Sequence, residues 1–308
     1  MAEIREISPE LAEKARTELN EVEKRIPEDI AALREWIFKQ PHLNARTNDQ
    51  FLVAFLRGCK YSLQKAKQKI DYFHAFKSIS PKEFTNIQIS DKTMKLTKLG
   101  PLLPLPNPMK PDGPRIILTR YEGIDLDEFS YLDLFKNQIR IFDIAMHEDD
   151  NCVIGGFINV VDMANVKLSF FLKFDPVLGK KFGVFTEKAV PFRVGSVHII
   201  NFPSEAMTIL KMIQQLMPKK IKERMMVHPT MESLYEYVPK EYLPEEYGGN
   251  NGRIGDSIET WEKLMIKYKN YFEEDDQYKT NEELRIGTKV NSESLFGLEG
   301  SFRKLEVD

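Results

Sequence analysis

The chain has 308 residues, of which 42% are hydrophobic and 30% are charged, and its formal net charge is −3 at pH 7. This composition is typical of a globular protein with a sizeable core, and it excludes a bulk electrostatic attraction to nucleic acid. No apolar run approaches the roughly 18 residues of a membrane-spanning helix, and the N-terminus lacks the apolar centre of a signal peptide. The two cysteines, Cys59 and Cys152, form neither a metal-ligand cluster nor a disulfide framework. We therefore expect a reduced, cytoplasmic protein that binds no nucleic acid.

The first part of the chain is expected to be helical. Ser8 followed by Pro9 is a strong helix-start signal, and Pro27 starts a second helix in the same way. A loop over residues 100–114 is too rich in proline for regular structure and interrupts the helical pattern. We therefore predict an N-terminal helical domain over residues 1–99.

Beyond the loop, strands and helices alternate. Buried strands are expected over residues 115–121, 153–163 and 194–201, with a short fourth strand over residues 224–228. Helices are expected over residues 131–148, 175–190 and 256–272. This alternation predicts an α/β fold in which helices cover a mainly parallel sheet. We place this domain at residues 100–255, followed by a C-terminal helix and a polar, partly disordered tail at residues 256–308.

No segment carries a recognisable catalytic or metal-binding motif. There is no phosphate loop, no G-x-G-x-x-G after a strand, no H-E-x-x-H and no G-x-S-x-G nucleophile elbow. The run from His147 to Asp150 falls at a predicted helix end and is read as solvated charge. We therefore predict no catalytic residue, no metal site and no cofactor, and we expect a protein that is not an enzyme.

The segment after the third strand is a helix with a wide apolar surface. At about 100° per residue over residues 204–217, its apolar side chains span an arc of roughly 160°, whereas a core-facing helix needs about 100°. These side chains are Met212, Leu216, Ile209, Ile213, Ala206, Met217 and Leu210. Met207 falls on the polar side. Two interpretations stay open, a helix buried on two sides or a gate that covers an apolar cavity when closed and meets a membrane when open.

A basic segment follows this helix directly. It covers residues 218–224 and contains Lys219, Lys220, Lys222 and Arg224. Beside an apolar helix, such cations suit anionic headgroups while the apolar side chains enter the lipid boundary. The same cluster is also compatible with a solvated helix face.

Four ordered segments resemble one known family. They are NDQFLVAFLRGCKYSLQKAK, GGFINVVDMANV, PFRVGSVHIINFP and LPEEYGG, which begin at Asn48, Gly155, Pro191 and Leu243. Together they are similar to the CRAL-TRIO lipid-transfer family over about residues 45–250, particularly its branch with alpha-tocopherol transfer protein and cellular retinaldehyde-binding protein. The resemblance implies a CRAL-TRIO N-type helical bundle followed by a sheet and helices that enclose a hydrophobic pocket. It also implies a carrier that delivers one small hydrophobic ligand, such as a tocopherol, retinoid or carotenoid, at phosphoinositide-containing membranes.

The resemblance further implies a gate and a headgroup site. The gate residues are Phe202, Ala206, Ile209, Leu210, Ile213, Leu216 and Met217. The residues expected to contact phosphoinositide headgroups are Arg57, Arg193, Lys220 and Arg224, with Lys219 as an added candidate. Cys59 and Gly195 stand where relatives carry cations, which implies a weaker or shifted headgroup site.

Candidate pocket residues share faces of the predicted elements. They are Phe135, Gln138, Ile139 and Phe142 on one helix, Phe157, Asn159 and Val161 on one strand, Val197 on the next strand, and Phe182, Phe185 and Val190 before the gate. Each of them alone is also compatible with ordinary core. The aromatic lining suits a polyene, prenyl or ring-bearing lipid. Gln138 and Asn159 are candidates for pairing either with a ligand hydroxyl or carbonyl or with backbone groups.

Two alternatives to a carrier stay open. One is a phosphoinositide-binding membrane-trafficking adaptor whose pocket is vestigial or holds a structural lipid. The other is a phospholipid exchanger, which is disfavoured because Phe192 stands where exchanging relatives carry a headgroup-binding Glu. In each case we expect a cytoplasmic protein that associates transiently with anionic membranes.

Overall fold

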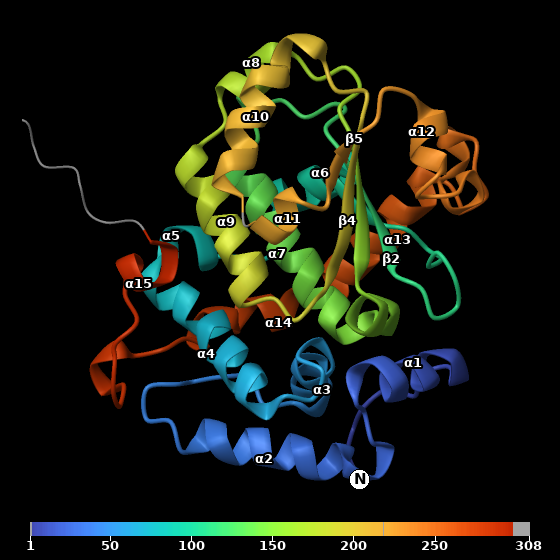
Figure 1. Cartoon of the computed structure of the whole chain (residues 1–308). Coiled ribbons are helices and arrows are strands. Elements are labelled where there is room, and N and C mark those ends of the chain that lie inside the picture. Colours follow the sequence, from blue (N-terminus) through green and yellow to red (C-terminus); the bar gives the residue numbers. More distant parts are fainter. Residues whose placement is uncertain (1, 218, 298–308) are drawn as a thin grey trace, which may run out of the picture.

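The protein is described by a computed structural model over residues 2–217 and 219–297, apart from the side chain of Leu216. Its first helices lie below a five-stranded sheet, and further helices flank the sheet on both sides (Figure 1). The sheet is mainly parallel, so the predicted α/β class is confirmed. The division into three domains stays a prediction.

The N-terminal helices form around one buried helix. They are α1 (Pro9–Leu19), α2 (Ile26–Phe38), α3 (Asp49–Gly58), α4 (Leu63–Ile79), α5 (Pro81–Phe84) and α6 (Asp91–Leu99). The Ser8 hydroxyl accepts the Leu11 N–H at the start of α1, as the sequence signal predicts. Helix α3 is apolar on nearly every side because it packs between α2, α4 and the helices of the sheet part. Phe51 and Phe73 join α3 to α4 with ring centroids 5.8 Å apart.

The sheet has the order β1-β2-β3-β4-β5. Its strands are β1 (Leu102–Pro104), β2 (Arg115–Arg120), β3 (Phe157–Asp162), β4 (Val194–Ile200) and β5 (Met225–Val227). Strand β1 runs antiparallel to β2, and all other neighbours are parallel. Strand β1 was not expected, because it lies inside the proline-rich loop. As an edge strand it needs hydrogen bonds on one side only, and this tolerates a proline.

Strand β3, predicted over residues 153–163, begins later than its apolar pattern indicates. Residues Asn151–Gly155 form a π-helical turn, and the strand starts only at Phe157. Gly156 separates the two with φ of 79°. A Cβ at this position would collide with the carbonyl oxygen of Arg193, so the backbone conformation and the close approach both require glycine.

The remaining helices flank the sheet. They are α7 (Tyr131–Glu148), α8 (Leu168–Leu172), α9 (Pro176–Lys188), α10 (Met207–Leu216), α11 (Lys219–Lys222), α12 (Met231–Tyr235), α13 (Ile254–Lys267), α14 (Lys269–Glu273) and α15 (Ser292–Phe296). Helix α7 has the predicted bounds and starts with a capping box between Ser130 and Asp133. In Figure 1, α7, α9 and α10 lie to the left of the sheet, and α12 lies to the right.

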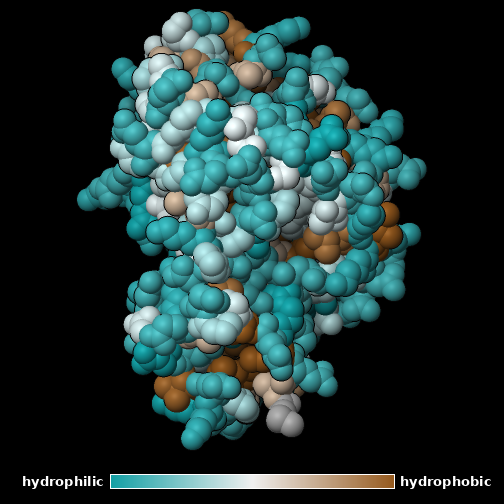
Figure 2. Space-filling model, turned by 90° about the vertical axis from the view of Figure 1, so that its right-hand side faces the viewer, coloured by the Kyte–Doolittle hydropathy of each residue, from teal (hydrophilic) through white to brown (hydrophobic). Residues whose placement is uncertain are grey.

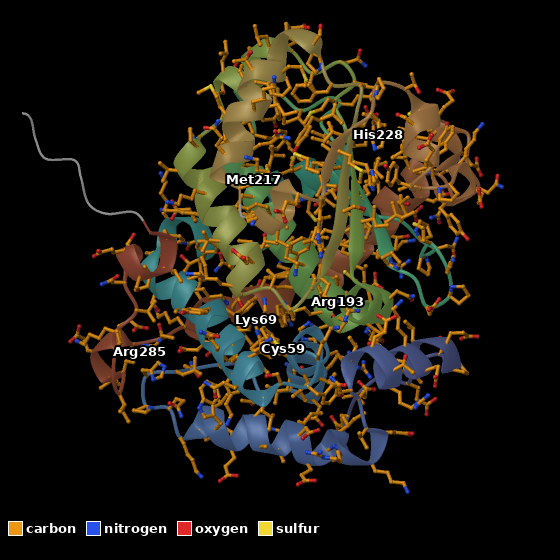
Figure 3. The ribbon with its side chains drawn as sticks, in the orientation of Figure 1. Cys59, Lys69, Arg193, Met217, His228 and Arg285 are labelled. Carbon is orange, nitrogen blue, oxygen red and sulfur yellow. The ribbon has the colours of Figure 1, made fainter. Side chains whose placement is uncertain are left out.

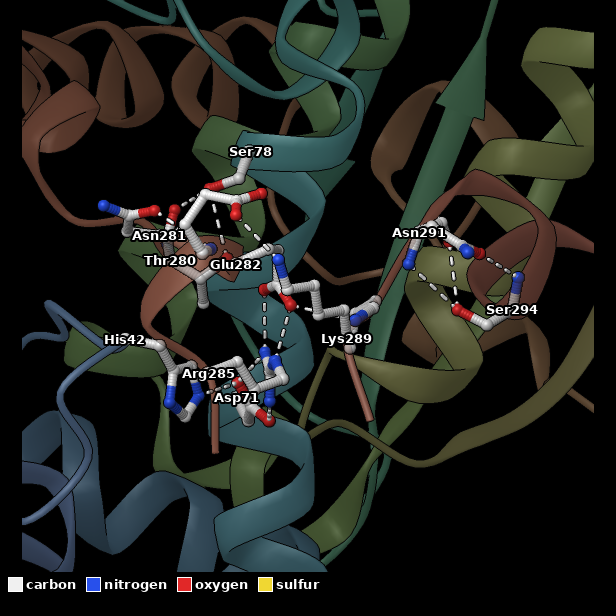
Figure 4. Close-up of polar contacts among 12 residues, drawn as sticks. His42, Asp71, Ser78, Thr280, Asn281, Glu282, Arg285, Lys289, Asn291 and Ser294 are labelled. Atoms are coloured by element: carbon white, nitrogen blue, oxygen red, sulfur yellow. Dashed lines mark hydrogen bonds and ion pairs between the residues drawn. The ribbon is translucent and has the colours of Figure 1, made fainter. Parts of the chain in front are cut away.

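The C-terminal segment crosses back over the N-terminal helices, although we expected it to be partly disordered. Arg285 pairs with Asp71 of α4, with Nη2 and Oδ1 2.8 Å apart (Figure 4). Lys77 Nζ donates to the buried Asp275 carboxylate at 2.6 Å. Phe296 then packs on Phe76, with ring centroids 5.5 Å apart. Residues 298–308 of the expected tail lie outside the described residues.

The face of the molecule shown in Figure 2 is largely hydrophilic, with hydrophobic patches over the lower, N-terminal part. None of the described helices combines the length and the apolar character needed to cross a bilayer. Over residues 2–217 and 219–297, no group of three or more His, Cys, Asp or Glu side chains is placed to hold a metal ion.

Two histidines form a hydrogen-bonded pair on one face of β4. His198 Nδ1 lies 2.9 Å from His228 Nε2, and His198 Nε2 lies 2.8 Å from the Ser196 hydroxyl. The Ser233 hydroxyl lies 3.1 Å from the other ring nitrogen of His228. Burial lowers the pKa of His198 to about 4, and His228 contributes in the same direction. Burial also lowers the pKa of His228. Both rings are therefore neutral at pH 7.

This pair predicts that acid destabilises the fold. In the unfolded chain these histidines bind protons near pH 6.5, whereas folded His198 binds one only near pH 4. Because the unfolded state then holds more protons, the free energy of unfolding falls as the pH is lowered from about 6.5 to about 4. Urea unfolding at several pH values should show this slope, and a His198→Gln/His228→Gln variant should show a shallower one. Equal slopes in the two proteins would contradict the prediction.

Candidate functional site

An apolar cavity of about 330 Å³ lies between the sheet and helices α7, α9 and α10. Strands β2, β3 and β4 form its floor, because alternate side chains of a strand point to the same face. Helices α7 and α9 form walls, and α10 closes one side. The volume lies at the lower end of the range of about 300–1,000 Å³ that is usual for ligand pockets.

Seven of the eleven predicted pocket residues line this cavity. They are Phe135, Gln138, Phe157, Asn159, Val161, Phe182 and Val197. The strand residues do so because the period of two places them on the inner face of the sheet. Only the N-terminal half of α7 lines the cavity. In this half, Tyr131 and Leu134 line it as well.

Four predicted pocket residues do not line the cavity, and each belongs to the surrounding core. Ile139 and Phe142 lie deeper along α7, and the Phe142 ring packs against Phe192 at 5.6 Å. Phe185 faces the N-terminal helices, with its ring 4.9 Å from that of Phe84. The carbonyl of Val190 accepts a hydrogen bond from Lys69 at 2.7 Å. The apolar periodicity of the sequence could not distinguish residues that line the cavity from residues in the core, because both positions require apolar side chains.

An aromatic group missed by the sequence analysis forms one end of the cavity. Phe170, Phe171 and Phe174 line it, and the Tyr131 hydroxyl donates to the Phe170 carbonyl at 2.5 Å. The Phe174 ring packs closely against α9 at Gly179. A Cβ at this position would collide with the ring, so the contact requires glycine. The run LSFFLKF, which begins at Leu168 shortly after β3, was the available signal.

The predicted gate helix divides its apolar side chains between the cavity and the surface. Four of its seven predicted residues line the cavity, namely Phe202, Leu210, Ile213 and Met217, the last of which is labelled in Figure 3. Ala206 is buried and Ile209 is half-buried, but neither lines the cavity. The Leu216 side chain lies outside the described residues. Met207, predicted on the polar side, packs against the core, whereas Met212 is 61% exposed.

Helix α10 is held mainly by apolar contacts. It has no side-chain hydrogen bond at its N-cap. Among the described side chains of α10, Gln214 forms the single hydrogen bond, from Nε2 to Met225 Sδ at 3.4 Å. Thioether sulfur is a weak acceptor, so this bond adds little. Such a helix can shift as a unit without leaving strong polar groups unpaired.

The predicted headgroup cations differ in their surroundings. Lys219 and Lys220 are exposed beside α10. Arg193 is half-buried and donates to the Ile154 carbonyl, and Arg224 donates in the same way to the Val194 carbonyl. Of these four cations, the two lysines are the most accessible to a ligand in this conformation, although Lys219 Nζ lies 3.8 Å from Glu223.

Arg57 has a structural environment that the sequence analysis did not foresee. Its side chain is 1% exposed, and its guanidinium lies 2.8 Å from Glu21 and 3.0 Å from Asp150. Burial alone would lower its pKa, but the hydrogen bond and charge of Glu21 and the charge of Asp150 raise it overall. In place of the predicted headgroup contact, the structure shows a buried ion-pair network that joins α3 to the segments directly after α1 and α7.

Lys69 is a cation near the headgroup candidates that sequence reasoning missed. Its ammonium donates to the Glu187 carbonyl at 2.8 Å, which ties α4 to the end of α9. Burial lowers its pKa to about 8, and the nearby charge of Lys220 acts in the same direction. Figure 3 places Lys69, Cys59 and Arg193 at the junction of the N-terminal helices with the sheet part.

Comparison with known proteins decides the family. Residues 106–249 match the CRAL/TRIO domain, and residues 22–94 match the Pinta-like, UBA domain. The resemblance to the CRAL-TRIO family is thus confirmed, and residues 106–249 are a CRAL-TRIO domain. Of the residues that line the cavity, all except Pro101 and Leu102 fall within the CRAL-TRIO match. The cavity is therefore a feature of the CRAL-TRIO domain.

Several known proteins are similar to this chain over most of their length. The chain is 27% identical to the alpha-tocopherol transfer protein-like protein of Homo sapiens, covering 84% of this chain and 75% of the relative. It is 25% identical to clavesin-1 of Rattus norvegicus, covering 84% and 73%. Among solved structures, the crystal structure of Sfh5 aligns with 86% of this chain and 100% of that chain, at 13% identity and a TM-score of 0.49.

Proposed function

We propose that this CRAL-TRIO protein is a carrier that holds one small hydrophobic molecule beneath α10 and delivers it at anionic, phosphoinositide-containing membranes. The observation that carries this proposal is the apolar cavity of about 330 Å³ closed by Phe202, Leu210, Ile213 and Met217. A ligand that buries roughly 400 Å² of apolar surface gains about 10 kcal/mol. Its escape into water is therefore slow, and a carrier needs contact with a membrane to release it.

The cavity favours a compact lipid over a two-chain phospholipid. Its volume is at the small end of the range for ligand pockets. Phe192 does not line it, and this ring packs on Phe142 in the core. No cation lines the cavity among the described residues, so a buried phosphate would be unpaired. These features argue against phospholipid exchange.

Exposed apolar side chains around the gate support a membrane contact. Leu172 of α8 is 70% exposed, and Met212 of α10 is 61% exposed. Leu168 and Val177, from α8 and α9, are exposed nearby. Helix α8 joins the start of the gate segment through Phe171 and Phe202, whose rings are 5.2 Å apart. A cluster of this kind beside a helix held mainly by apolar contacts fits insertion into the lipid boundary.

The exposed lysines of α11 support attraction to anionic headgroups. We expect Lys219→Ala/Lys220→Ala/Lys222→Ala to weaken binding to phosphoinositide vesicles, by up to about 1 kcal/mol or fivefold for each lysine. Ligand transfer to the vesicles should fall in parallel, while retention of bound ligand in buffer stays unchanged. Vesicle co-sedimentation and fluorescent transfer assays, with vesicles of equal charge but without phosphoinositide as comparison, check this.

A matched triple variant controls for bulk charge. Lys95, Lys98 and Lys263 are similarly exposed but lie on α6 and α13. Replacing these three by alanine should leave vesicle binding nearly unchanged. Equal losses in the two triple variants, or a loss of retention in buffer, would count against a delivery surface at α11.

A further inference from the structure

A polar pair interrupts the apolar floor of the cavity. Thr119 of β2 and Asn159 of β3 both line the cavity, and the Thr119 hydroxyl donates to Asn159 Oδ1 at 2.8 Å. Neighbours of Asn159 on the same strand face, Phe157 and Val161, are apolar. A cavity built only to hold hydrocarbon has no use for an amide and a hydroxyl at these positions, because unpaired polar groups weaken apolar binding.

The bond from Thr119 determines what Asn159 offers to a ligand. With Oδ1 accepting from the hydroxyl, the amide presents Nδ2 and its two hydrogens. Among the described residues, no group accepts a hydrogen bond from Asn159 Nδ2. The free end of the pair is therefore a hydrogen-bond donor that faces an apolar space.

The charges around the cavity restrict the ligand further. Asp175 is the single ionisable carboxyl among the described lining residues, and its Oδ1 accepts the N–H groups of Val177 and Leu178 at 2.9 and 3.1 Å. No Lys, Arg or His is among these lining residues. A carboxylate or phosphate on the ligand would lie in an apolar space without a cation, which is strongly unfavourable.

We infer that Asn159, oriented by Thr119, binds an uncharged oxygen at one end of the ligand. The cargo class is then a compact single-chain or ring-bearing lipid that carries a hydroxyl or carbonyl group, rather than a hydrocarbon, a fatty acid or a phospholipid. This inference rests on the carrier function proposed above. A donor left unpaired in an apolar site lowers affinity about tenfold or more, so oxygen-bearing ligands should be preferred by at least that factor.

The test uses lipids of matched skeleton. Vesicles carrying equal amounts of phytane, phytanol, phytanic acid, retinol and retinoic acid are incubated with the full chain, and the bound lipids are quantified by mass spectrometry. We expect the two alcohols to be retained at least tenfold over the two acids and over phytane. Asn159→Leu should reduce the preference for alcohols over phytane to threefold or less, while phytane is retained as well as before. The preference over the acids should stay, because the cavity still has no lining cation.

Two further variants separate anchoring from packing. Thr119→Val keeps the side-chain shape but removes the orienting hydroxyl, and should give an intermediate preference. Ile158→Val alters a buried side chain of β3 that does not line the cavity, and should keep the wild-type preference. The inference is overturned if the wild type retains alcohols, acids and hydrocarbon equally, or if Asn159→Leu keeps the wild-type preference for alcohols over phytane. Retention of none of the five lipids would instead contradict the carrier function itself, and the inference with it.

Discussion

Replacing Arg57 by alanine is expected to lower the free energy of unfolding by about 3–5 kcal/mol. The guanidinium is buried between Glu21 and Asp150, and Tyr61 donates a further hydrogen bond to Glu21 at 2.7 Å. Removing the cation leaves Glu21 buried without a charged partner and leaves Asp150 with Arg5 alone. Arg5 also pairs with Asp150, at 2.8 Å, so the loss should spread to the N-terminal segment. Urea unfolding measures the change.

The same variant decides whether Arg57 is structural or contacts headgroups. Arg25→Ala is a suitable control, since Arg25 pairs with Asp29 at 3.3 Å but is itself 60% exposed. Such surface pairs contribute about 0–1 kcal/mol. At a temperature where Arg57→Ala is still folded, its vesicle binding should match that of the wild type. Unchanged stability together with lost vesicle binding would restore the headgroup role and refute the structural one.

Val161→Trp is expected to abolish ligand retention by filling the cavity. Val161 lies on the central strand β3 and lines the floor, so a larger side chain extends into the space that a ligand would occupy. Overpacking of this kind costs about 1–3 kcal/mol of stability, which a fold of this size tolerates. The lysines of α11 are untouched, and vesicle binding should therefore persist. Mass spectrometry of bound lipid and vesicle co-sedimentation measure the two effects.

This variant also separates the carrier from the adaptor. For an adaptor with a vestigial pocket, the wild type should hold no exchangeable lipid, and Val161→Trp should change neither membrane recruitment nor partner binding. For a carrier, transfer between vesicles should disappear while recruitment remains. Val161→Ile provides the graded control, because it adds one methylene and should weaken retention only slightly. Full ligand retention by Val161→Trp would show that the cargo is bound elsewhere.

Much of the fold follows from local signals along the chain. The Ser8 cap, the Ser130 capping box and the apolar period of α7 each act within a few residues, so they are readable in sequence. The parallel sheet follows in the same way from the alternation of strands and helices. The exceptions are segments whose conformation is set by distant neighbours, such as the π-helical turn at Asn151–Gly155 and the ordered C-terminal segment.

The candidate site was only partly predictable for a related reason. Phe135 and Phe142 have the same residue type and share one face of α7, yet one lines the cavity and the other packs on Phe192. An apolar side chain lines the cavity only where no side chain from another element packs against it, and this depends on the tertiary structure. Met212 was predicted on the apolar side of α10 but is exposed, and Met207 was predicted on the polar side but packs against the core. The rotation of α10 about its axis is set by its packing on α9 and the sheet.

The sequence by itself determined the α/β class, the family resemblance and the apolar character of the pocket and gate, because these depend on periodicity and on the order of motifs. Only the tertiary structure decided that Arg57 is neutralised by Glu21 and Asp150, and that Thr119 orients Asn159 inside the cavity. These partners lie between 36 and 93 positions apart in the chain. The chemistry of a side chain depends on the groups that folding brings within a few ångströms, and no local pattern records them.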